Sequence, residues 1–535
     1  MSNSWTLQRD TAVRVLRPEG AVYETAAAQL LHYLNALCGI TEARSQSAPA
    51  IILRTDPSMP PDAFRLVVRG NDLHLVGQNG RGVLYAVFAL AERFGCRFFA
   101  HDTEVIPHPA ELSLPDGLDV TEASPFAYRD LYWIGTTDPL TAVKLRINGT
   151  GLKSGQHIRH LTAEVGGGIG YAGPHFVHTF DLLLPPEKYF AEHPEYYALI
   201  DGKRTAKHLY SQPCLSNPEV QQLVADQIID FFKTNPNYTV ASIGQNDGNG
   251  DPASEDYANW CECDDCKKFA TDFTQAMMKF ANIIGQKIEK QCPGKSIMFY
   301  GYFPTFTAPN TTALKAEDNV VMMLCKEGGL TRFIRNGNLF NAAIGQPQFK
   351  DNYQAWKDLG YQMAIYEWNC PGAASDKWKD MFWIQGEVFL DNLKWLKQNG
   401  TQYLCMDQGP NPAYERADGY MDIRWPLWYV SAKGMWDCNL SFEDILMPAC
   451  KKLFGPAAAD MYAFYKALND ANKNCTAPNY YWALPEPEQV YTAQWLAKAD
   501  AAMDRALDAA AKAGGDVFKR VENQSANWEV TKQYT

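Results

Sequence analysis

The sequence predicts a mixed α/β protein in which a (β/α)8 barrel of the TIM type is the central domain. Strand-like apolar runs alternate with helical patterns over residues 123–450, as expected for such a barrel. A small α/β domain is expected before it at residues 1–120, and a helical C-terminal region after it at residues 451–535. A doubly wound sheet is the alternative architecture for the central domain.

The expected amino-terminal domain combines two helices with short strands. Helical spacing covers residues 21–38 and ends at Gly39, and a second amphipathic helix covers residues 80–95. Strand-like runs separated by Pro, Asp and Gly lie at 50–54, 64–68, 72–77 and 96–100. Pro107, Pro109 and Pro115 are expected to mark a linker.

The central domain is predicted from its strand–helix alternation. Strands are expected at 128–134, 238–244, 297–302, 319–325, 362–368 and 402–407. Helices are expected at 218–233, 265–291, 353–359 and 386–398, and further helices at 442–454, 457–471 and 489–512. Residues 150–215 are rich in Gly, His and Tyr and break the rhythm, which predicts long loops at the barrel mouth.

Charge and hydropathy exclude several classes of partner. The formal net charge of −12 leaves no basic excess to neutralise phosphates, so we expect no nucleic-acid or anionic-membrane partner. No run of 18 apolar residues is present, so no membrane span is expected. The first residues, 1–5, lack the charged and apolar segments of a secretory signal.

The 13 cysteines are an odd number and fall into two kinds. Cys325 and Cys405 lie in apolar runs, where buried free thiols are expected. Cys261, Cys263 and Cys266 form a Cys-x-Cys-x-x-Cys cluster that could supply three ligands of a structural zinc site, with the fourth from elsewhere. A disulfide within this loop is equally open. We expect no cofactor and no catalytic metal.

Polar residues follow several of the predicted strands. Parallel α/β folds place their chemistry at the carboxyl ends of strands. The residues at these ends are Asn246, Asp247, Tyr300, Tyr302, Glu327, Glu367, Trp368, Asn369, Asp407 and Gln408. The alternative for 246–248 is an Asn-Asp-Gly turn without chemistry. The alternative for Glu367 is a buried acid paired with an Arg or a helix N-terminus.

Two carboxylates beside aromatic residues at a barrel mouth suit glycoside hydrolysis. One group protonates the departing oxygen, and an acetamido group on the substrate can itself supply the nucleophile. Asp247, Glu367 and Asn246 are therefore the catalytic candidates. Side chains expected to bind substrate are His178, Tyr300, Tyr302, Glu327, Trp368 and Asp407.

Half of the ten histidines gather at His157, His160, His175, His178 and His193. A metal site is conceivable there, but sugar-hydroxyl binding or loop packing is favoured. The glycine-rich run 166–170 is not followed by Lys-Ser/Thr or by a helix, so it predicts a flexible loop and not a phosphate cradle.

Several motifs resemble known families. Residues 80–99, from Gly-Arg-Gly-Val-Leu-Tyr to Cys-Arg-Phe-Phe, resemble the domain that precedes the barrel in α-glucuronidases and β-hexosaminidases. His178-Thr-Phe, His193-Pro-Glu-Tyr, Gln245-Asn-Asp-Gly and the cysteine cluster look like a large bacterial family, formerly a domain of unknown function and now partly glycoside hydrolase family 163. The resemblance covers roughly residues 20–450.

This resemblance implies an endo-β-N-acetylglucosaminidase that cleaves N-glycans with retention through substrate-assisted catalysis. It also implies a bacterial protein exported to the periplasm or cell surface. Related acetamido-directed enzymes use adjacent acids such as Asp-Glu, whereas this chain has Asn246-Asp247, so Glu367 competes with Asp247 for the acid role.

Two alternative functions remain open. One is an exo-acting β-hexosaminidase or α-glucuronidase, in which Lys326, Arg332 and Arg335 would bind a uronate. The other is a non-catalytic glycan-binding protein.

Overall fold

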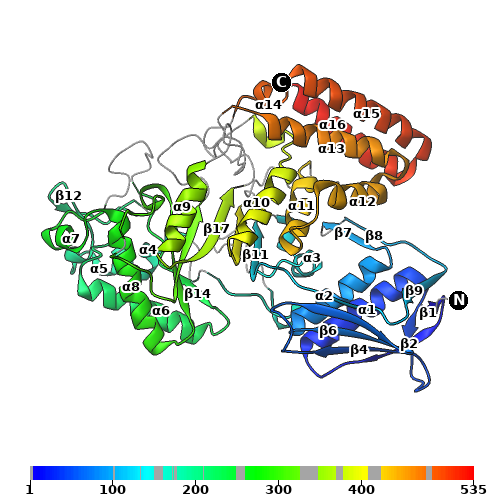
Figure 1. The fold of residues 1–535 in the computed structure, drawn as a ribbon, viewed down its shortest axis with the longest axis horizontal. Helices are drawn as coiled ribbons and strands as arrows, with labels where there is room; N and C mark the ends of the chain where they lie inside the picture. Colours follow the sequence, from blue (N-terminus) through cyan, green and yellow to red (C-terminus); the bar gives the residue numbers. More distant parts are fainter. Residues whose placement is uncertain are drawn as a thin grey trace.

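The structure, a computed structural model, describes residues 4–100, 103–132, 134–149, 161–171, 173, 177–208, 210–248, 260–311, 313–325, 347–368, 377–407, 423–477 and 485–535. Figure 1 shows a blue amino-terminal sheet, a central sheet flanked by green and yellow helices, and a carboxyl-terminal group of orange to red helices. Within these ranges no helix is long and apolar enough to cross a membrane.

The amino-terminal sheet has the strand order β10-β5-β6-β4-β2-β3. Its strands are β2 (Ala12–Leu16), β3 (Thr41–Glu42), β4 (Ala50–Thr55), β5 (Phe64–Arg69), β6 (Asp72–Gly77) and β10 (Asp119–Glu122). Helices α1 (Ala21–Cys38) and α2 (Gly80–Arg93) pack against each other, and α2 lies against β6. Gly39 adopts the left-handed conformation that ends α1, as the sequence predicted.

The prediction of a linker was wrong for Pro115, which lies in a strand, whereas Pro107 and Pro109 lie outside the strands. β8 (Thr103–Val105) pairs with β7 (Arg97–Ala100), and β9 (Glu111–Pro115) pairs with β1 (Ser4–Gln8). Both pairs are two-stranded sheets, and Pro115 is the last residue of its strand. Proline is tolerated there because an edge or terminal position loses no interior hydrogen bond of a sheet.

The central sheet is parallel and curled into a half-barrel (Figure 1). Its strand order is β11-β18-β17-β16-β15-β14, and each neighbouring pair is parallel. The strands are β11 (Tyr128–Tyr132), β14 (Val240–Ser242), β15 (Ser296–Gly301), β16 (Val320–Cys325), β17 (Gln362–Trp368) and β18 (Tyr403–Asp407). All carboxyl ends therefore meet at one edge of the sheet.

Both faces of this sheet are buried, as parallel sheets require. Along β17, Ala364 and Tyr366 belong to an inner cluster with side chains from all the other strands of this sheet. Met363 and Ile365 belong to the main core, on the face that the helices cover. Side chains alternate along each strand with a period of two residues, so the sheet has an inner face and an outer face.

Isolated parallel bridges add hydrogen bonding between β11 and β14. They join Gly149 to Ile169, Gly170 to Tyr238, and Gly173 to Ala241. A Cβ on Gly170 would lie 2.4 Å from the Tyr238 ring, and one on Gly173 would lie 2.1 Å from Phe231, so the close approach needs glycine. The described strands form a half-barrel, and single bridges rather than strands occupy the remaining arc.

Helices cover the outer face of the half-barrel. They include α6 (Pro218–Thr234), α8 (Phe273–Gln291), α9 (Pro347–Asp358), α10 (Gly386–Gln398) and α11 (Trp425–Trp436). The helix predicted at 265–291 is divided into α7 (Asp264–Phe269) and α8, because Asp272 caps a new helix by accepting a hydrogen bond from the amide of Gln275. The C-terminal helices are α12 (Phe442–Phe454), α13 (Ala458–Asn474), α14 (Pro487–Val490), α15 (Ala493–Ala513) and α16 (Gly515–Lys532).

A buried carboxylate joins the amino-terminal domain to the central sheet. Asp62 Oδ1 accepts hydrogen bonds from Asn79 (3.0 Å) and Arg81 (2.5 Å). Its Oδ2 accepts from Arg129 of β11 (3.0 Å) and from Asn148 (2.7 Å). Burial raises the pKa of Asp62, but the two guanidinium groups outweigh burial and hold this pKa well below its usual range.

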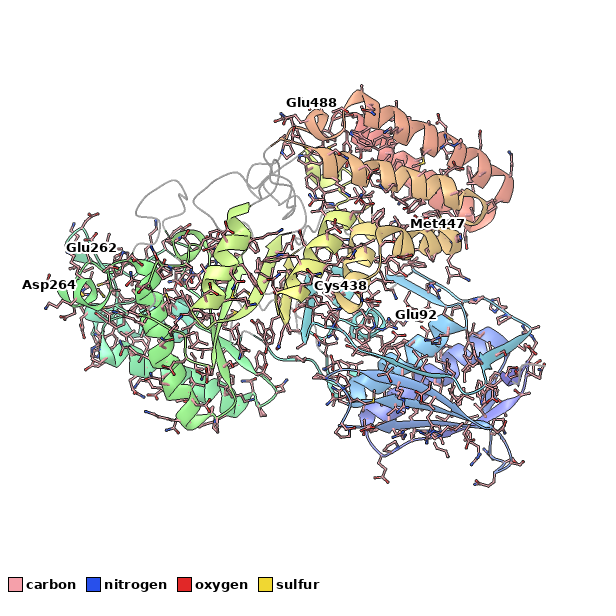
Figure 2. All side chains as sticks on the ribbon, in the orientation of Figure 1. Glu92, Glu262, Asp264, Cys438, Met447 and Glu488 are labelled. Atoms are coloured by element: carbon pink, nitrogen blue, oxygen red, sulfur yellow. The ribbon has the colours of Figure 1, made fainter. Side chains whose placement is uncertain are left out.

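A second buried acid lies where α2 meets α11. Figure 2 shows Glu92 between the amino-terminal domain and the yellow helices. Glu92 accepts a 2.7 Å hydrogen bond from Arg146 and another from Lys433. Burial opposes ionisation, but Arg146 and Lys433 lower the pKa of Glu92 to about 2. Ion pairs of two buried acids therefore hold the parts of the chain together.

Replacing Asp62 with Asn should lower the free energy of unfolding by about 3–5 kcal/mol, because Arg81 and Arg129 would stay buried without their counter-ion. Urea unfolding followed by tryptophan fluorescence measures this change. The control Asp119→Asn breaks the half-exposed pair with Arg65 and should cost about 0–1 kcal/mol. Equal losses of unfolding free energy in the two variants would contradict the proposal that Asp62 connects the two domains.

Acid should weaken the protein through Glu92. Its folded pKa of about 2 lies below its ordinary value, so its ion pairs stabilise the fold above about pH 4.3, and this stabilisation is lost as the pH falls towards 2. Melting temperatures between pH 7 and pH 2.5 should therefore fall less steeply in Glu92→Gln than in the wild type. Parallel curves would contradict this assignment.

Candidate functional site

The candidate site is built on the chain that leaves β14 at the carboxyl edge of the sheet. Thr179 fixes this exit, because its backbone N–H and its hydroxyl both donate to the carbonyl of Gly244, at 2.9 and 3.1 Å. A Cβ on Gly244 would lie 2.3 Å from the Tyr300 ring, so only glycine allows β14 and β15 to approach here. The polar residues 245–247 follow directly.

Asn246 is held by its backbone and its side chain. Its N–H donates to Gln212 Oε1 (3.0 Å), and its carbonyl accepts from Gln212 Nε2 (2.9 Å). Its Nδ2 donates to Asp181 Oδ1 and to the Ser211 carbonyl, both at 2.8 Å. Asn246 is buried, at 3% exposure, and this set of bonds fixes the direction of the chain that presents Asp247.

Two amide oxygens at this site have no hydrogen-bond partner among the residues that the structure describes. Gln245 Nε2 donates to Thr305 Oγ1 (2.6 Å) and to the Tyr300 carbonyl (3.3 Å), whereas its Oε1 has no partner there. Asn246 Oδ1 is also buried and without a partner in this part of the chain. Buried amide oxygens usually accept a hydrogen bond, so these atoms can receive one from a water or a ligand.

Asp247 carries the accessible carboxylate of the site. Its side chain is 41% exposed, and its Oδ1 lies 3.8 Å from His178 Nε2. The hydroxyl of Tyr302 donates to the same oxygen at 3.4 Å. His178 is oriented by its Nδ1, which lies 3.0 Å from the carbonyl of Gln245 and therefore carries the proton. A phenol and an imidazole thus flank one open carboxylate.

The predicted residues within β15, β17 and β18 are either buried or have side chains outside the described residues. Tyr300 is buried at 4% exposure in the inner cluster, and this burial raises its pKa well above the usual range. Glu367 is buried at 2% and follows the outer-face position of Ile365 by two residues. Trp368 and Asp407 end β17 and β18, and pair in register, but their side chains lie outside the described residues.

Other sequence candidates lie outside the described residues altogether. They are Glu327, Asn369, Gln408, the cationic set Lys326, Arg332 and Arg335, and the histidines His157, His160 and His175. His193 is described: its Nδ1 lies 3.0 Å from Glu195, and its ring stacks on Tyr196 at 4.6 Å. His193 therefore takes part in loop packing. It contacts Glu195 and Tyr196, whereas His178 contacts residues 245–247.

Sequence reasoning missed the residues that support Asn246. Asp181 bonds both Asn246 and His208, whose Nδ1 lies 2.7 Å from Asp181 Oδ2. Gln212 and Ser211 come from a different segment, over 30 residues earlier than Asn246. No local pattern marks these residues, because their role depends on a long-range contact. The carboxylate of Asp130, fully buried beside the Tyr128 hydroxyl at 2.6 Å, was also missed.

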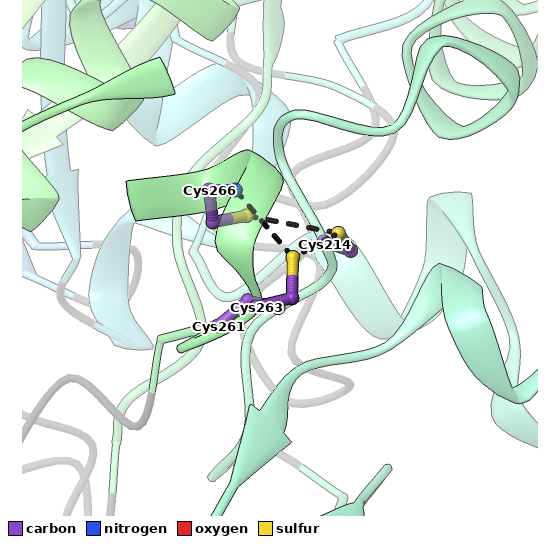
Figure 3. A group of neighbouring side chains, drawn as sticks. All are labelled: Cys214, Cys261, Cys263 and Cys266. Carbon is purple, nitrogen blue, oxygen red and sulfur yellow. Dashed lines mark hydrogen bonds between the residues drawn. The ribbon is translucent and has the colours of Figure 1, made fainter. Parts of the chain in front are cut away.

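Two groups of described residues have the donor atoms to hold a metal. The first contains the sulfur atoms of Cys214, Cys261, Cys263 and Cys266 (Figure 3). The second contains His193, Glu195 and Glu219, which are half-buried or exposed. Neither of these two groups includes Asp247.

The family model "Domain of unknown function (DUF4838)" matches residues 98–467 of this chain. No curated protein matches the chain in sequence. The matched range begins in the amino-terminal domain, includes the whole half-barrel and ends in α13.

The chain is similar to several solved structures, two of which align with TM-scores above 0.5. The family GH115 4-O-methyl-α-glucuronidase BtGH115A, with specificity for decorated arabinogalactans, aligns with a TM-score of 0.59 and 11% identity, covering 99% of this chain and 73% of that chain. A GH138 enzyme targeting pectin rhamnogalacturonan II aligns with a TM-score of 0.53 and 12% identity, covering 98% and 69%. The chitobiase FjGH20 of Flavobacterium johnsoniae gives a TM-score of 0.49 at 12% identity, covering 99% and 90%.

These structural neighbours are glycoside hydrolases. At such low identities the likeness shows the fold alone. It identifies neither the reaction of this chain nor its substrate.

Replacing Gln212 with Ala should loosen the chain at Asn246, because the variant leaves a buried N–H and a buried C=O without their partners. We expect amide hydrogen exchange at residues 244–248 to become at least about tenfold faster, which corresponds to about 1.4 kcal/mol. The control Gln222→Ala removes an exposed glutamine and should leave this exchange unchanged. Equal exchange in both variants would show that Gln212 does not hold the site.

Proposed function

We propose that this chain, which belongs to the DUF4838 family, is a glycoside hydrolase with its active site at Asp247. The observation that carries the proposal is the open carboxylate of Asp247 between Tyr302 and His178, at the carboxyl edge of a parallel sheet. Sugar-cleaving enzymes need a carboxyl group of this kind to protonate the departing oxygen. The glycoside hydrolase fold of the structural neighbours supports the same conclusion.

The barrel is part of this proposal. The half-barrel and the bridges at Gly149, Gly170 and Gly173 support a complete (β/α)8 barrel, in which the bridged segments fill the arc between β11 and β14. In such a barrel the catalytic groups lie at the carboxyl ends of the strands. Asp247 follows β14 in this position.

The proposed reaction is substrate-assisted cleavage of a β-linked N-acetylglucosamine. The acetamide oxygen of the sugar forms a bond to the anomeric carbon as the glycosidic bond breaks, and the departing oxygen takes the proton of Asp247. Water then attacks the anomeric carbon, the bond from the acetamide oxygen to that carbon breaks, and the water gives a proton to the Asp247 carboxylate. The configuration is retained because two displacements occur at one carbon.

The neighbours of Asp247 have separate tasks in this mechanism. Tyr302 and His178 orient the carboxyl group and bind polar groups of the sugar. Asn246 is a positioning residue, because both hydrogens of its Nδ2 are used by Asp181 and Ser211. Its buried Oδ1 remains able to accept a hydrogen bond from the sugar or from a water. Glu327, Trp368 and Asp407 remain proposed substrate contacts.

Glu367 is the second catalytic candidate, and the sheet supplies a reason to rank it below Asp247. Side chains alternate along β17, so Glu367 takes the outer-face position that Met363 and Ile365 take before it. It is also 2% exposed, against 41% for the Asp247 side chain. We therefore assign the proton transfer to Asp247 and a supporting role to Glu367.

The proposed substrate is an N-glycan, cut within its chitobiose core by endo action. The support is the set of motifs around His178, His193 and Gln245 that resembles glycoside hydrolase family 163. The same resemblance supports export to the periplasm or cell surface of a bacterium. An exo-acting β-hexosaminidase or α-glucuronidase is the second candidate, and the GH115 neighbour favours the α-glucuronidase. A non-catalytic glycan-binding role is the third.

Mass spectrometry after incubation with a complex N-glycoprotein separates these functions. We expect released glycans that end in one N-acetylglucosamine, with one such sugar left on the protein. Release of single hexosamine or uronic acid residues would favour an exo-acting enzyme. Binding without any product from a broad glycan panel would favour the glycan-binding role.

Asp247→Asn should lower kcat by roughly two or more orders of magnitude, the usual effect of losing an acid/base group. Its melting temperature should stay close to that of the wild type, because the Asp247 side chain is half-exposed. The control Asp230→Asn, at a side chain that is 74% exposed, should keep full activity. Near-wild-type turnover in Asp247→Asn would remove this residue from the mechanism.

Glu367→Gln tests the ranking of the two acids. We expect it to lower the melting temperature more than Asp247→Asn does, and kcat less, because Glu367 is buried on the outer face. A loss of kcat as large as in Asp247→Asn, without loss of stability, would instead make Glu367 a catalytic acid.

A further inference from the structure

Four cysteine sulfurs lie close together in a small lobe that contains residues 199–204 and 264–269, at the edge of the molecule (Figure 1). Cys214 precedes α6, Cys261 and Cys263 precede α7, and Cys266 lies in the first turn of α7. All four Sγ atoms lie within 4.8 Å of one another, and Figure 3 shows Cys214 and Cys263 directed towards Cys266. Three of the four are buried and Cys263 is partly buried.

The sulfur separations fit a single metal ion better than disulfides. Cys214 Sγ lies 3.6 Å from Cys266 Sγ and 3.8 Å from Cys263 Sγ. Zinc–sulfur bonds of about 2.3 Å in a tetrahedron place neighbouring sulfurs about 3.8 Å apart. A disulfide needs about 2.05 Å between its sulfurs. The structure records none of these four cysteines in a disulfide.

Hydrogen-bond donors surround these sulfurs as they surround metal-bound thiolates. The amide of Leu199 donates to Cys261 Sγ at 3.3 Å, and Arg204 donates to the same atom at 3.4 Å. The amide of Cys266 donates to Cys263 Sγ at 3.4 Å. Donors of this kind stabilise the negative charge of thiolates and fix their direction.

The lobe has little hydrophobic core of its own. Its buried cluster contains Ala198 besides the cysteines, and Leu199, Ile200 and Trp260 only pack against it. Its regular structure is the two-residue pair β12 (Leu199–Ile200) and β13 (Lys203–Arg204) with the six-residue α7. Lobes this small commonly depend on a metal or on disulfides for their stability.

The same lobe supports the candidate active site. Cys214 lies two residues after Gln212 and three after Ser211, the residues that hold Asn246. The N–H of Cys214 also donates to the carbonyl of Tyr196, at 2.8 Å, which ties this segment to the lobe. A metal bound to Cys214 would therefore also hold Ser211 and Gln212, the residues that hydrogen-bond to Asn246.

We propose that Cys214, Cys261, Cys263 and Cys266 bind one structural zinc ion that anchors the segment 211–214 beneath the active site. The donor set is four thiolates whose sulfurs lie within 4.8 Å of one another, which selects zinc or a single iron among the common metals. Zinc needs no redox partner and suits a closed site without an open position. This proposal does not depend on the reaction at Asp247.

The first test measures the metal and the thiols of the wild-type protein. We expect about one zinc per chain by mass spectrometry of the metal, and an intact mass with no disulfide after denaturation in an alkylating reagent. Iron in place of zinc would overturn the proposal. So would a protein without bound metal whose intact mass shows that the four cysteines were not alkylated because they form two disulfides. This measurement does not depend on any variant folding.

Matched variants then locate the zinc. Cys214→Ser should reduce the zinc content at least about tenfold, since three ligands bind far more weakly than four. Cys214→His should retain the zinc, because imidazole also ligates this metal. The control Cys292→Ser, at a partly buried cysteine outside the cluster, should keep the full content. Zinc that is unaffected by Cys214→Ser would contradict the assignment.

Chelation connects the zinc to the active site. Removing the metal with 1,10-phenanthroline should speed amide exchange at residues 244–248, the same peptides that Gln212 holds. We expect activity to fall with zinc loss and to return when zinc is added back. Unchanged exchange at these residues would overturn the anchoring role, whatever the activity of the protein towards glycans.

Discussion

The buried carboxylate of Asp62 connects the amino-terminal domain to the central sheet, and the arrangement of these two parts depends on it. It accepts from Arg81 of α2 and from Arg129 of β11, so it fixes the amino-terminal domain against the first strand of the central sheet. Its bond to Asn148 also places the segment whose Gly149 bridges to Ile169. A buried ion needs such complete pairing, because removing one partner leaves an uncompensated charge.

The carboxyl edge of the sheet combines a firmly held residue with a half-exposed carboxylate. Gln212 pairs with both backbone groups of Asn246, and Asp181 holds its side chain. Asp247, the next residue, is left accessible beside Tyr302 and His178. A catalytic carboxyl group would have to be both held and reachable, and the contrast between the buried Asn246 and the half-exposed Asp247 is consistent with the proposed role. The four cysteines extend the support outward, because Cys214 shares its short segment with Gln212.

Local signals predicted many elements of the fold but only the outline of the candidate site. The helix 386–398 has its predicted bounds, since apolar spacing and flanking residues define it. Pro115 misled, because proline at a strand end has the same local pattern as proline in a linker. The expectation that polar residues follow strands pointed to Asn246, which does follow β14, but it could not show that Gln212 holds this residue or that Cys214 lies with the other three cysteines. Contacts between distant segments leave no local pattern.

We propose that Asp247 serves a retaining, acetamide-assisted hydrolysis. Proton NMR of the anomeric signals during the first minutes of hydrolysis of a chitobiose-core glycan tests it most directly. We expect the β-anomer of the released reducing sugar to appear first and then to mutarotate. First appearance of the α-anomer, or the same rate from a substrate that lacks the acetamido group, would contradict it.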